Sequence, residues 1–155
     1  QPVTANFAPY LLERAQIYMN NDQARNAMLD YDAYYKAVNG QVNDLFYYYR
    51  EQAALKARQY QRALDDIVKA VELSPKDLTY RAEHAVVNLR VGRYEESMKI
   101  LNEILKDEPK YGEAYRLLGL CQIQLKKTDE ACGNFNKAKE LGDPNVDELI
   151  KKYCK

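Results

Sequence analysis

The stretch "RQYQRALDDIVKAVELSP" (58–75) decides the fold, because its pattern returns twice further along the chain. The later copies are "GRYEESMKILNEILKDEP" (92–109) and "KTDEACGNFNKAKELGDP" (127–144). Each begins with polar turn residues and continues into an acidic segment whose small and apolar residues keep one spacing. Three columns step by 34 residues: Ala63, Ser97 and Ala131; Ile67, Leu101 and Phe135; Ala70, Ile104 and Ala138. Ala27 and Tyr31 fit an earlier copy, with a step of 36 residues from Ala27 to Ala63.

The composition indicates an all-helical protein without a phosphate-binding surface. Gly and Pro together contribute eleven of 155 residues, which leaves few chain breakers. Lys plus Arg equals Asp plus Glu at 23 each, and zero net charge argues against a nucleic-acid partner. No apolar run approaches the roughly 20 residues that cross a bilayer, so we expect no membrane insertion.

Each repeat reads as two antiparallel helices. Ala63, Ile67 and Ala70 recur at helical spacing, whereas Asp65 and Lys69 fall on the opposite face. Small residues at Ala15, Ala85 and Gly119 of the first helices would allow close helix crossing. Glu51 takes that place in the second repeat and must either crowd the crossing or turn out to solvent. Arg50 and His84 stand where the fourth repeat has Leu118.

"YRLLG" (115–119), followed by Ala131, Phe135, Ala138 and Pro144, resembles the tetratricopeptide repeat, a helix–turn–helix unit of 34 residues. The resemblance covers the chain from about Phe7 to Pro144 and implies an all-α fold, an αα-superhelix or solenoid. We expect one domain over 1–155, with repeats near 8–43, 44–77, 78–111 and 112–144 and a capping helix at 145–153. Asp143 is expected to cap that helix and Pro144 to occupy its first position.

The resemblance also implies a concave groove, lined by the first helices, in which a peptide or helix of a partner binds. Groove residues implied in this way are Leu12, Gln16, Met19, Tyr48, Gln52, Lys56, Val86, Arg90, Arg116 and Leu120. Tyr48, Gln52, Ala82 and Val86 do not reproduce the Lys and Asn clamp that members of the family use for acidic C-terminal tails. A ligand with an apolar face and one or two acidic residues suits this stripe better.

The three cysteines should gather near one end of the stack, from the positions of Cys121, Cys132 and Cys154 on their helices. Free buried thiols, a Cys132–Cys154 disulfide, a Cys121–Cys132 disulfide and a three-thiolate metal site are all open alternatives. A metal site lacks a fourth ligand, and the single histidine, His84, cannot supply a two-His site. We therefore expect no metal and no cofactor.

No motif for a reaction is present: there is no phosphate loop, nucleophile elbow or metal-binding helix pattern. We expect a non-enzymatic interaction module or scaffold whose partner is a protein or peptide. The alternative is a structural or regulatory segment of a larger enzyme or cell-envelope assembly.

The expected compartment rests on the two ends of the sequence. The first residue is Gln1 rather than Met, so we expect a chain processed or excised from a longer one. The ending "AC…LGDP…KKYC" (131–154) is similar to that of bacterial, notably Bacteroidetes, repeat proteins. Together with the clustered cysteines this favours a periplasmic or secreted protein, with a cytoplasmic one as the alternative.

Overall fold

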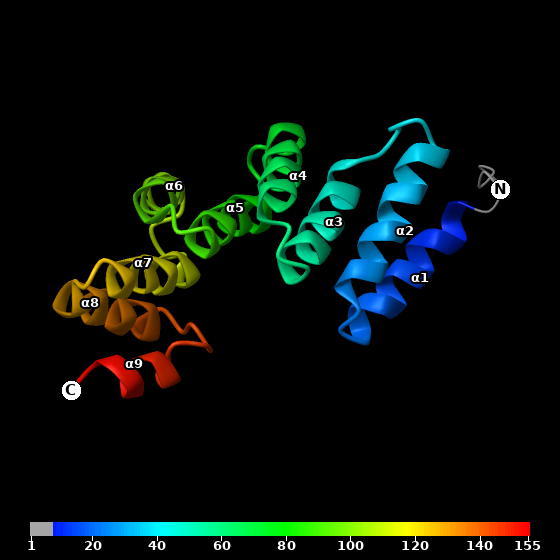
Figure 1. The fold of residues 1–155 in the computed structure, drawn as a ribbon. Coiled ribbons are helices and arrows are strands. Elements are labelled where there is room, and N and C mark those ends of the chain that lie inside the picture. The colour runs from blue at the N-terminus through cyan, green and yellow to red at the C-terminus, as the bar shows by residue number, and fades with distance from the viewer. Residues whose placement is uncertain (1–7) are drawn as a thin grey trace. The chain divides into compact units, whose positions relative to one another are not determined.

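The computed structural model describes residues 8–155, and Phe7, where we expect the resemblance to begin, lies outside them. Over this range the chain forms nine helices and no strand, which confirms the all-α prediction (Figure 1). Their bounds are α1 (Ala8–Asn20), α2 (Ala24–Ala37), α3 (Asp44–Lys56), α4 (Tyr60–Leu73), α5 (Leu78–Arg90), α6 (Tyr94–Asp107), α7 (Gly112–Gln124), α8 (Thr128–Glu140) and α9 (Asp147–Tyr153).

The helices form two compact units that divide between Pro75 and Lys76. In the N-terminal unit, α1 and α2 make the first hairpin, α3 and α4 make the second, and α2 packs against α3. In the C-terminal unit, α5 and α6 make the third hairpin and α7 and α8 the fourth, with α6 against α7. The short α9 packs against α8 and closes that unit (Figure 1).

The turn inside each hairpin has the same backbone conformation. Asp22, Arg58, Gly92 and Lys126 all have positive φ, between 58° and 85°, and follow one another at the repeat spacing. In each turn the next residue donates its N–H back five positions into the ending helix, as Arg93 does to the Asn88 carbonyl at 2.8 Å. This bond satisfies carbonyl groups left over at the helix end. One of these four turn residues is glycine and the other three are not, so the turns are hard to recognise from sequence.

Two first helices are capped by side chains in the loops that precede them. The Asn43 side-chain oxygen accepts a hydrogen bond from the N–H of Phe46 at 3.0 Å, which starts α3. Asp77 does the same for the N–H of Tyr80 at 3.1 Å, which starts α5. Such caps typically contribute about 1 kcal/mol each.

In three of the four hairpins, the first helix has a small residue at the helix crossing and the second helix has a larger residue sixteen positions later. In the fourth hairpin, Gly119 faces Phe135, and a Cβ added to Gly119 would lie 2.4 Å from the ring. The third hairpin instead has Ala85 at this position, with Leu101 sixteen residues on. Both are fully buried. The smaller residue on the first helix therefore goes with the larger residue on the second helix, which limits the difference in combined volume between the two pairs.

Glu51 occupies this small-residue position in the second hairpin. Its side chain is fully buried, so it does not turn out to solvent. The second hairpin accommodates a carboxyl group at its helix crossing, where the other three hairpins have Ala15, Ala85 and Gly119.

The capping helix begins two residues later than the sequence predicts, at Asp147. The Asp143 carboxylate is almost fully buried and binds Arg116 of α7 at 3.0 Å, and the residue at the cap position of α9 is Val146 instead. Asp143 also accepts the N–H of Asn145 at 2.7 Å, which keeps Pro144 in a turn rather than at the first helical position. Val146 then precedes α9 and packs in the core with Ala131, Phe135 and Ala138.

The cysteines divide into one pair and one single thiol. Cys132 of α8 and Cys154, directly after α9, form a disulfide with an S–S distance of 2.01 Å and a Cα–Cα distance of 5.7 Å. Cys121 of α7 is free and buried, and its burial raises the pKa of the thiol. A buried thiol with a raised pKa is a poor nucleophile and a poor metal ligand.

Candidate functional site

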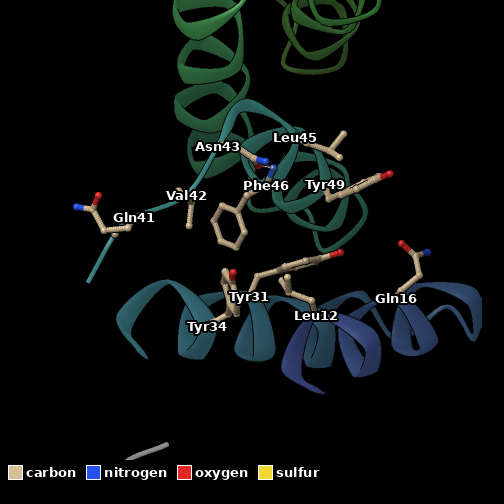
Figure 2. Close-up of a pocket in the computed structure, with 11 residues that line it drawn as sticks. Leu12, Gln16, Tyr31, Tyr34, Gln41, Val42, Asn43, Leu45, Phe46 and Tyr49 are labelled. Carbon is tan, nitrogen blue, oxygen red and sulfur yellow. Dashed lines mark hydrogen bonds between the residues drawn. The ribbon is translucent and has the colours of Figure 1, made fainter. Parts of the chain in front are cut away.

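A pocket of about 580 Å³ opens in the N-terminal unit between α1, α2, α3 and the loop that joins α2 to α3 (Figure 2). Figure 2 shows Leu45, Phe46 and Tyr49 of α3 on one side of the space, facing side chains of α1 and α2. Its eleven lining residues are Leu12, Gln16, Tyr31, Tyr34, Gly40, Gln41, Val42, Asn43, Leu45, Phe46 and Tyr49. The volume lies within the range typical of ligand sites.

The floor of the pocket is aromatic and well packed. Phe46 meets Tyr31 edge to face at a centroid distance of 5.9 Å and stacks on Tyr34 at 5.6 Å. Both Tyr31 and Phe46 are buried, and burial raises the pKa of the Tyr31 hydroxyl to about 12. At the rim, Leu45 and Tyr49 are 42% and 39% exposed, which leaves apolar surface open to a ligand.

The loop between α2 and α3 forms one end of the pocket. This loop runs over residues 38–43, whereas the corresponding loops before α5 and α7 are 74–77 and 108–111. It is therefore two residues longer, which accounts for the step of 36 residues instead of 34 near the start of the sequence. Residues 40–43 of this longer loop line the pocket.

A second hollow, of about 450 Å³, lies in the same unit beside the turns that end α1 and α3. Its charged lining residues are Asp22, Arg25, Lys56 and Arg58, of which Lys56 binds Asp22 at 2.7 Å. That ion pair holds the pKa of the exposed Asp22 carboxyl below its usual value. Within residues 8–155, Arg25 and Arg58 form no ion pair, so this end of the unit carries two uncompensated cations.

The groove residues implied for the N-terminal unit lie on the exposed or half-buried sides of α1 and α3. Leu12 and Gln16 line the aromatic pocket, and Lys56 lines the charged hollow. Met19, Tyr48 and Gln52 are half-buried and line neither. The ring centroids of Tyr48 and Tyr49 lie 5.8 Å apart. Of these two tyrosines, Tyr49 lines the pocket and Tyr48 does not.

The groove residues implied for the C-terminal unit have different surroundings. Val86 and Leu120 are half-buried and pack against the core of their own unit. Arg116 is held by Asp143 at 3.0 Å and by Glu113 at 3.6 Å, so its charge is already compensated. Arg90 is exposed at the end of α5 and, among the described residues, forms no ion pair.

Sequence reasoning missed the contribution of α2 to the pocket. Tyr31 and Tyr34 belong to a second helix, and the repeat pattern directed attention to the first helices alone. The available signals were the step of 36 residues and the concentration of tyrosine in "YDAYYKAVNGQVN" (31–43).

Two classes of site find no support in the described part of the chain. Among residues 8–155, no group of three or more His, Cys, Asp or Glu side chains is arranged to hold a metal ion. Likewise, no helix in this range is both long and apolar enough to traverse a bilayer.

Two family models match the sequence. The model described as "Anaphase-promoting complex, cyclosome, subunit 3" matches residues 20–104, which is more than half of the chain. The model described as "Tetratricopeptide repeat" matches residues 82–146.

Curated relatives agree with the family models. The chain is 29% identical over 99 residues to small glutamine-rich tetratricopeptide repeat-containing protein 2 of Mycosarcoma maydis, covering 64% of this chain and 28% of that protein. It is 31% identical over 101 residues to heat shock protein STI1 of Saccharomyces cerevisiae, and this match covers 63% of this chain and 17% of STI1. The chain thus spans less than a third of the length of either relative.

Solved structures confirm the fold class. The crystal structure of YrrB, described as a TPR protein with an unusual peptide-binding site, matches with a TM-score of 0.77. The match covers 94% of this chain and 74% of that one at 19% sequence identity, so it bears on the fold alone.

Proposed function

Because the chain belongs to the tetratricopeptide repeat family, we propose that it is a non-enzymatic interaction module that binds a peptide or helix of a protein partner on its first helices. The observation that carries this proposal is the solvent-open aromatic pocket beside the outer faces of α1 and α3. A soluble chain gains nothing in stability by leaving Leu45 and Tyr49 exposed there. Exposed aromatic and aliphatic side chains around a hollow are typical of binding sites.

Similar proteins support a peptide or protein as the partner. YrrB is described as a TPR protein with an unusual peptide-binding site. The chain covers only 28% and 17% of the length of the two curated relatives named above, so their activities as whole proteins are not carried over to it. The alternative role is a structural or regulatory segment of a larger enzyme or cell-envelope assembly.

Affinity capture from native extract tests the function. The bait is the full 155-residue chain, compared with a variant that carries Gln16→Ala, Gln52→Ala and Arg90→Ala. These three side chains lie on the implied groove face and are at least partly exposed, so the variant should fold. Arg116 is left intact because it binds Asp143, and its loss would disturb the fourth hairpin. Tyr48 is left intact because its ring contacts that of Tyr49.

A matched control changes exposed residues of the second helices: Gln61→Ala, Lys99→Ala and Asn136→Ala. We expect the wild type and the control to retain the same partner and the groove variant to lose it, at unchanged circular dichroism. Equal capture by all three proteins would contradict binding on the first helices.

A further inference from the structure

The aromatic pocket of the N-terminal unit is free of charge. Charged residues make up 30% of the chain, yet none of the eleven lining residues is Asp, Glu, Lys or Arg. An ionised side chain placed against Tyr31 and Phe46 would lose its water without gaining a partner, at a cost of several kcal/mol. The pocket therefore selects an uncharged, bulky side chain, aliphatic or aromatic.

Polar groups around the pocket match a peptide main chain. The Asn43 carbonyl oxygen is already engaged by the N–H of Phe46, so its NH₂ group is left to donate. Gln16 donates its NH₂ group to Asn20 at 3.1 Å, which leaves its carbonyl oxygen to accept. One donor and one acceptor at a pocket rim are what the C=O and N–H of an extended segment require.

The charged hollow at the other end of the unit has the opposite character. After Lys56 and Asp22 neutralise each other, Arg25 and Arg58 leave two positive charges there. An exposed ion pair with a partner carboxylate is worth only about 0.2–1 kcal/mol, so these cations add little affinity. These cations do favour one orientation of a bound peptide, because they attract its acidic residue to the end of the unit that carries Arg25 and Arg58.

A continuous stripe connects the two sites. Leu45 lines the pocket, Lys56 lines the hollow, and Gln52 lies between them at spacings of seven and four residues, on one side of α3. Eleven helical residues correspond to about 16 Å along the axis. An extended peptide covers that distance in about five residues.

From these features we infer that the N-terminal unit binds an extended segment of another protein that carries a bulky uncharged residue and, about five residues away, an acidic residue. The uncharged side chain enters the aromatic pocket, and the carboxylate lies near Arg25 and Arg58. The inference rests on the proposed function and specifies the chemistry of the partner.

Selection from a phage library of random 12-residue peptides tests the inference. The full chain is the target, and selected sequences are remade as synthetic fluorescein-labelled peptides for measurement of Kd by fluorescence polarisation. We expect the selected peptides to share a bulky uncharged residue and an Asp or Glu about five positions apart. No enrichment, or enrichment of peptides without this pair, would overturn the inference.

Two single substitutions locate the anchor. Leu45→Lys puts a cation at the pocket rim, and Leu29→Lys makes the same change on α2, outside the pocket, where the side chain is 68% exposed. We expect Leu45→Lys to raise Kd at least tenfold and Leu29→Lys to leave it unchanged, with both variants folded by circular dichroism. Equal Kd values for the two variants would overturn the pocket assignment.

The double variant Arg25→Glu with Arg58→Glu tests the charged end. We expect a three- to tenfold rise in Kd at low salt that disappears at high salt, because exposed charges are screened. No change at low salt would overturn the assigned direction.

Sedimentation of the wild type and Leu45→Lys tests a second copy of the chain as the occupant. A wild-type dimer that Leu45→Lys dissociates would overturn the inference in favour of self-association. If native capture depends on the first helices while Leu45→Lys binds like Leu29→Lys, the pocket assignment fails and the proposed function stands. If the wild type captures no partner, the proposed function itself fails.

Discussion

The two units of the molecule join the helices of their hairpins by different chemistry at one equivalent position. In the N-terminal unit this position holds an arginine that binds an aspartate sixteen residues later. Arg14 binds Asp30 at 2.7 and 2.8 Å, and Arg50 donates from Nε and Nη2 to the two carboxylate oxygens of Asp66, each at 2.9 Å. Both aspartates are almost fully buried.

In the C-terminal unit the same position holds His84 and Leu118, and the residues sixteen further on are Ile100 and Asn134. Neither pair is ionic. Leu118 is part of the buried core of its unit, and Asn134 donates instead to the Gln122 side chain at 2.6 Å. The hairpin fold therefore accepts either an ion pair or two uncharged residues at these positions.

The ion pair of Arg50 with Asp66 is surrounded by further ring and charge contacts. The Arg50 guanidinium lies 4.9 Å from the Tyr35 ring centroid and 5.0 Å from that of Phe46, and it also contacts Asp32. Asp32 binds Arg62 of α4 as well. Burial raises the pKa of the Asp66 carboxyl despite its two bonds to Arg50. A buried pair of this kind is geometrically specific, but its desolvation offsets much of its attraction.

Removing one member of this pair should give the largest effect. Arg50→Ala leaves the Asp66 carboxylate buried beside an empty space, and we expect a loss of about 3–5 kcal/mol in the free energy of unfolding. Arg50→Met with Asp66→Leu replaces both charges by apolar side chains and should lose far less, because no charge is left buried without a partner. Urea unfolding followed by circular dichroism measures both. A double variant as unstable as Arg50→Ala would show that the two solutions are not interchangeable.

The disulfide stabilises the C-terminal unit in a way that has no counterpart in the described part of the N-terminal one. Replacing Cys132 and Cys154 by Ser removes a link across 22 residues, and we expect a loss of about 2–4 kcal/mol. We propose that the bridge forms in an oxidising compartment, periplasmic or extracellular. Thiol titration of denatured, non-reduced protein from its native source should then find one free thiol per chain, Cys121. Three free thiols would contradict both the bridge and the compartment.

Gly119→Ala tests how tightly the fourth hairpin is packed. Alanine favours the helix by about 1 kcal/mol, but its Cβ would lie 2.4 Å from the Phe135 ring. We expect a net loss of about 1–3 kcal/mol from overpacking. Gly119→Ala with Phe135→Leu copies the Ala85–Leu101 pair of the third hairpin and should recover most of that loss. A stabilising effect of Gly119→Ala alone would show that the ring moves aside freely.

His84 should give the smallest effect, visible as a dependence on pH. Burial lowers the pKa of His84, against a smaller opposing effect of Glu96. The folded state therefore disfavours the protonated imidazole, so stability is full above pH 6.5 and is lost as the pH falls through the folded pKa. His84→Leu, which copies Leu118, should flatten the decline between pH 7 and 5. Parallel curves for the two proteins would rule out this contribution.

The repeat columns predict the helical hairpins well because a period of 34 residues with small residues at fixed places reflects local packing. Ala63 and Ala131 of one column and Ala70 and Ala138 of another are all fully buried, as their recurrence suggests. The pocket was not predictable in this way, because it depends on a longer loop that breaks the period. Consecutive helical residues point about 100° apart, so an error of one position exchanges Tyr48 for Tyr49.

Charges were harder to assign than packing. Arg116 fits the implied groove by its position, but Asp143, 27 residues later, binds it in the folded chain. The expected cap of α9 fails because the helix begins at Asp147, so that Val146 and not Asp143 takes the cap position. Glu51 lies at a position where sequence alone leaves burial and exposure open, and the structure buries it.

The composition of the aromatic pocket has an optical consequence. The chain contains fourteen tyrosines and no tryptophan, and three of the tyrosines, Tyr31, Tyr34 and Tyr49, line this pocket. Near-ultraviolet absorption and emission of the unmodified protein therefore come mainly from tyrosine, and three of the fourteen tyrosines report from the pocket. A ligand that carries tryptophan would add the only indole in the sample and would accept excitation energy from these rings, so occupancy is readable without a label.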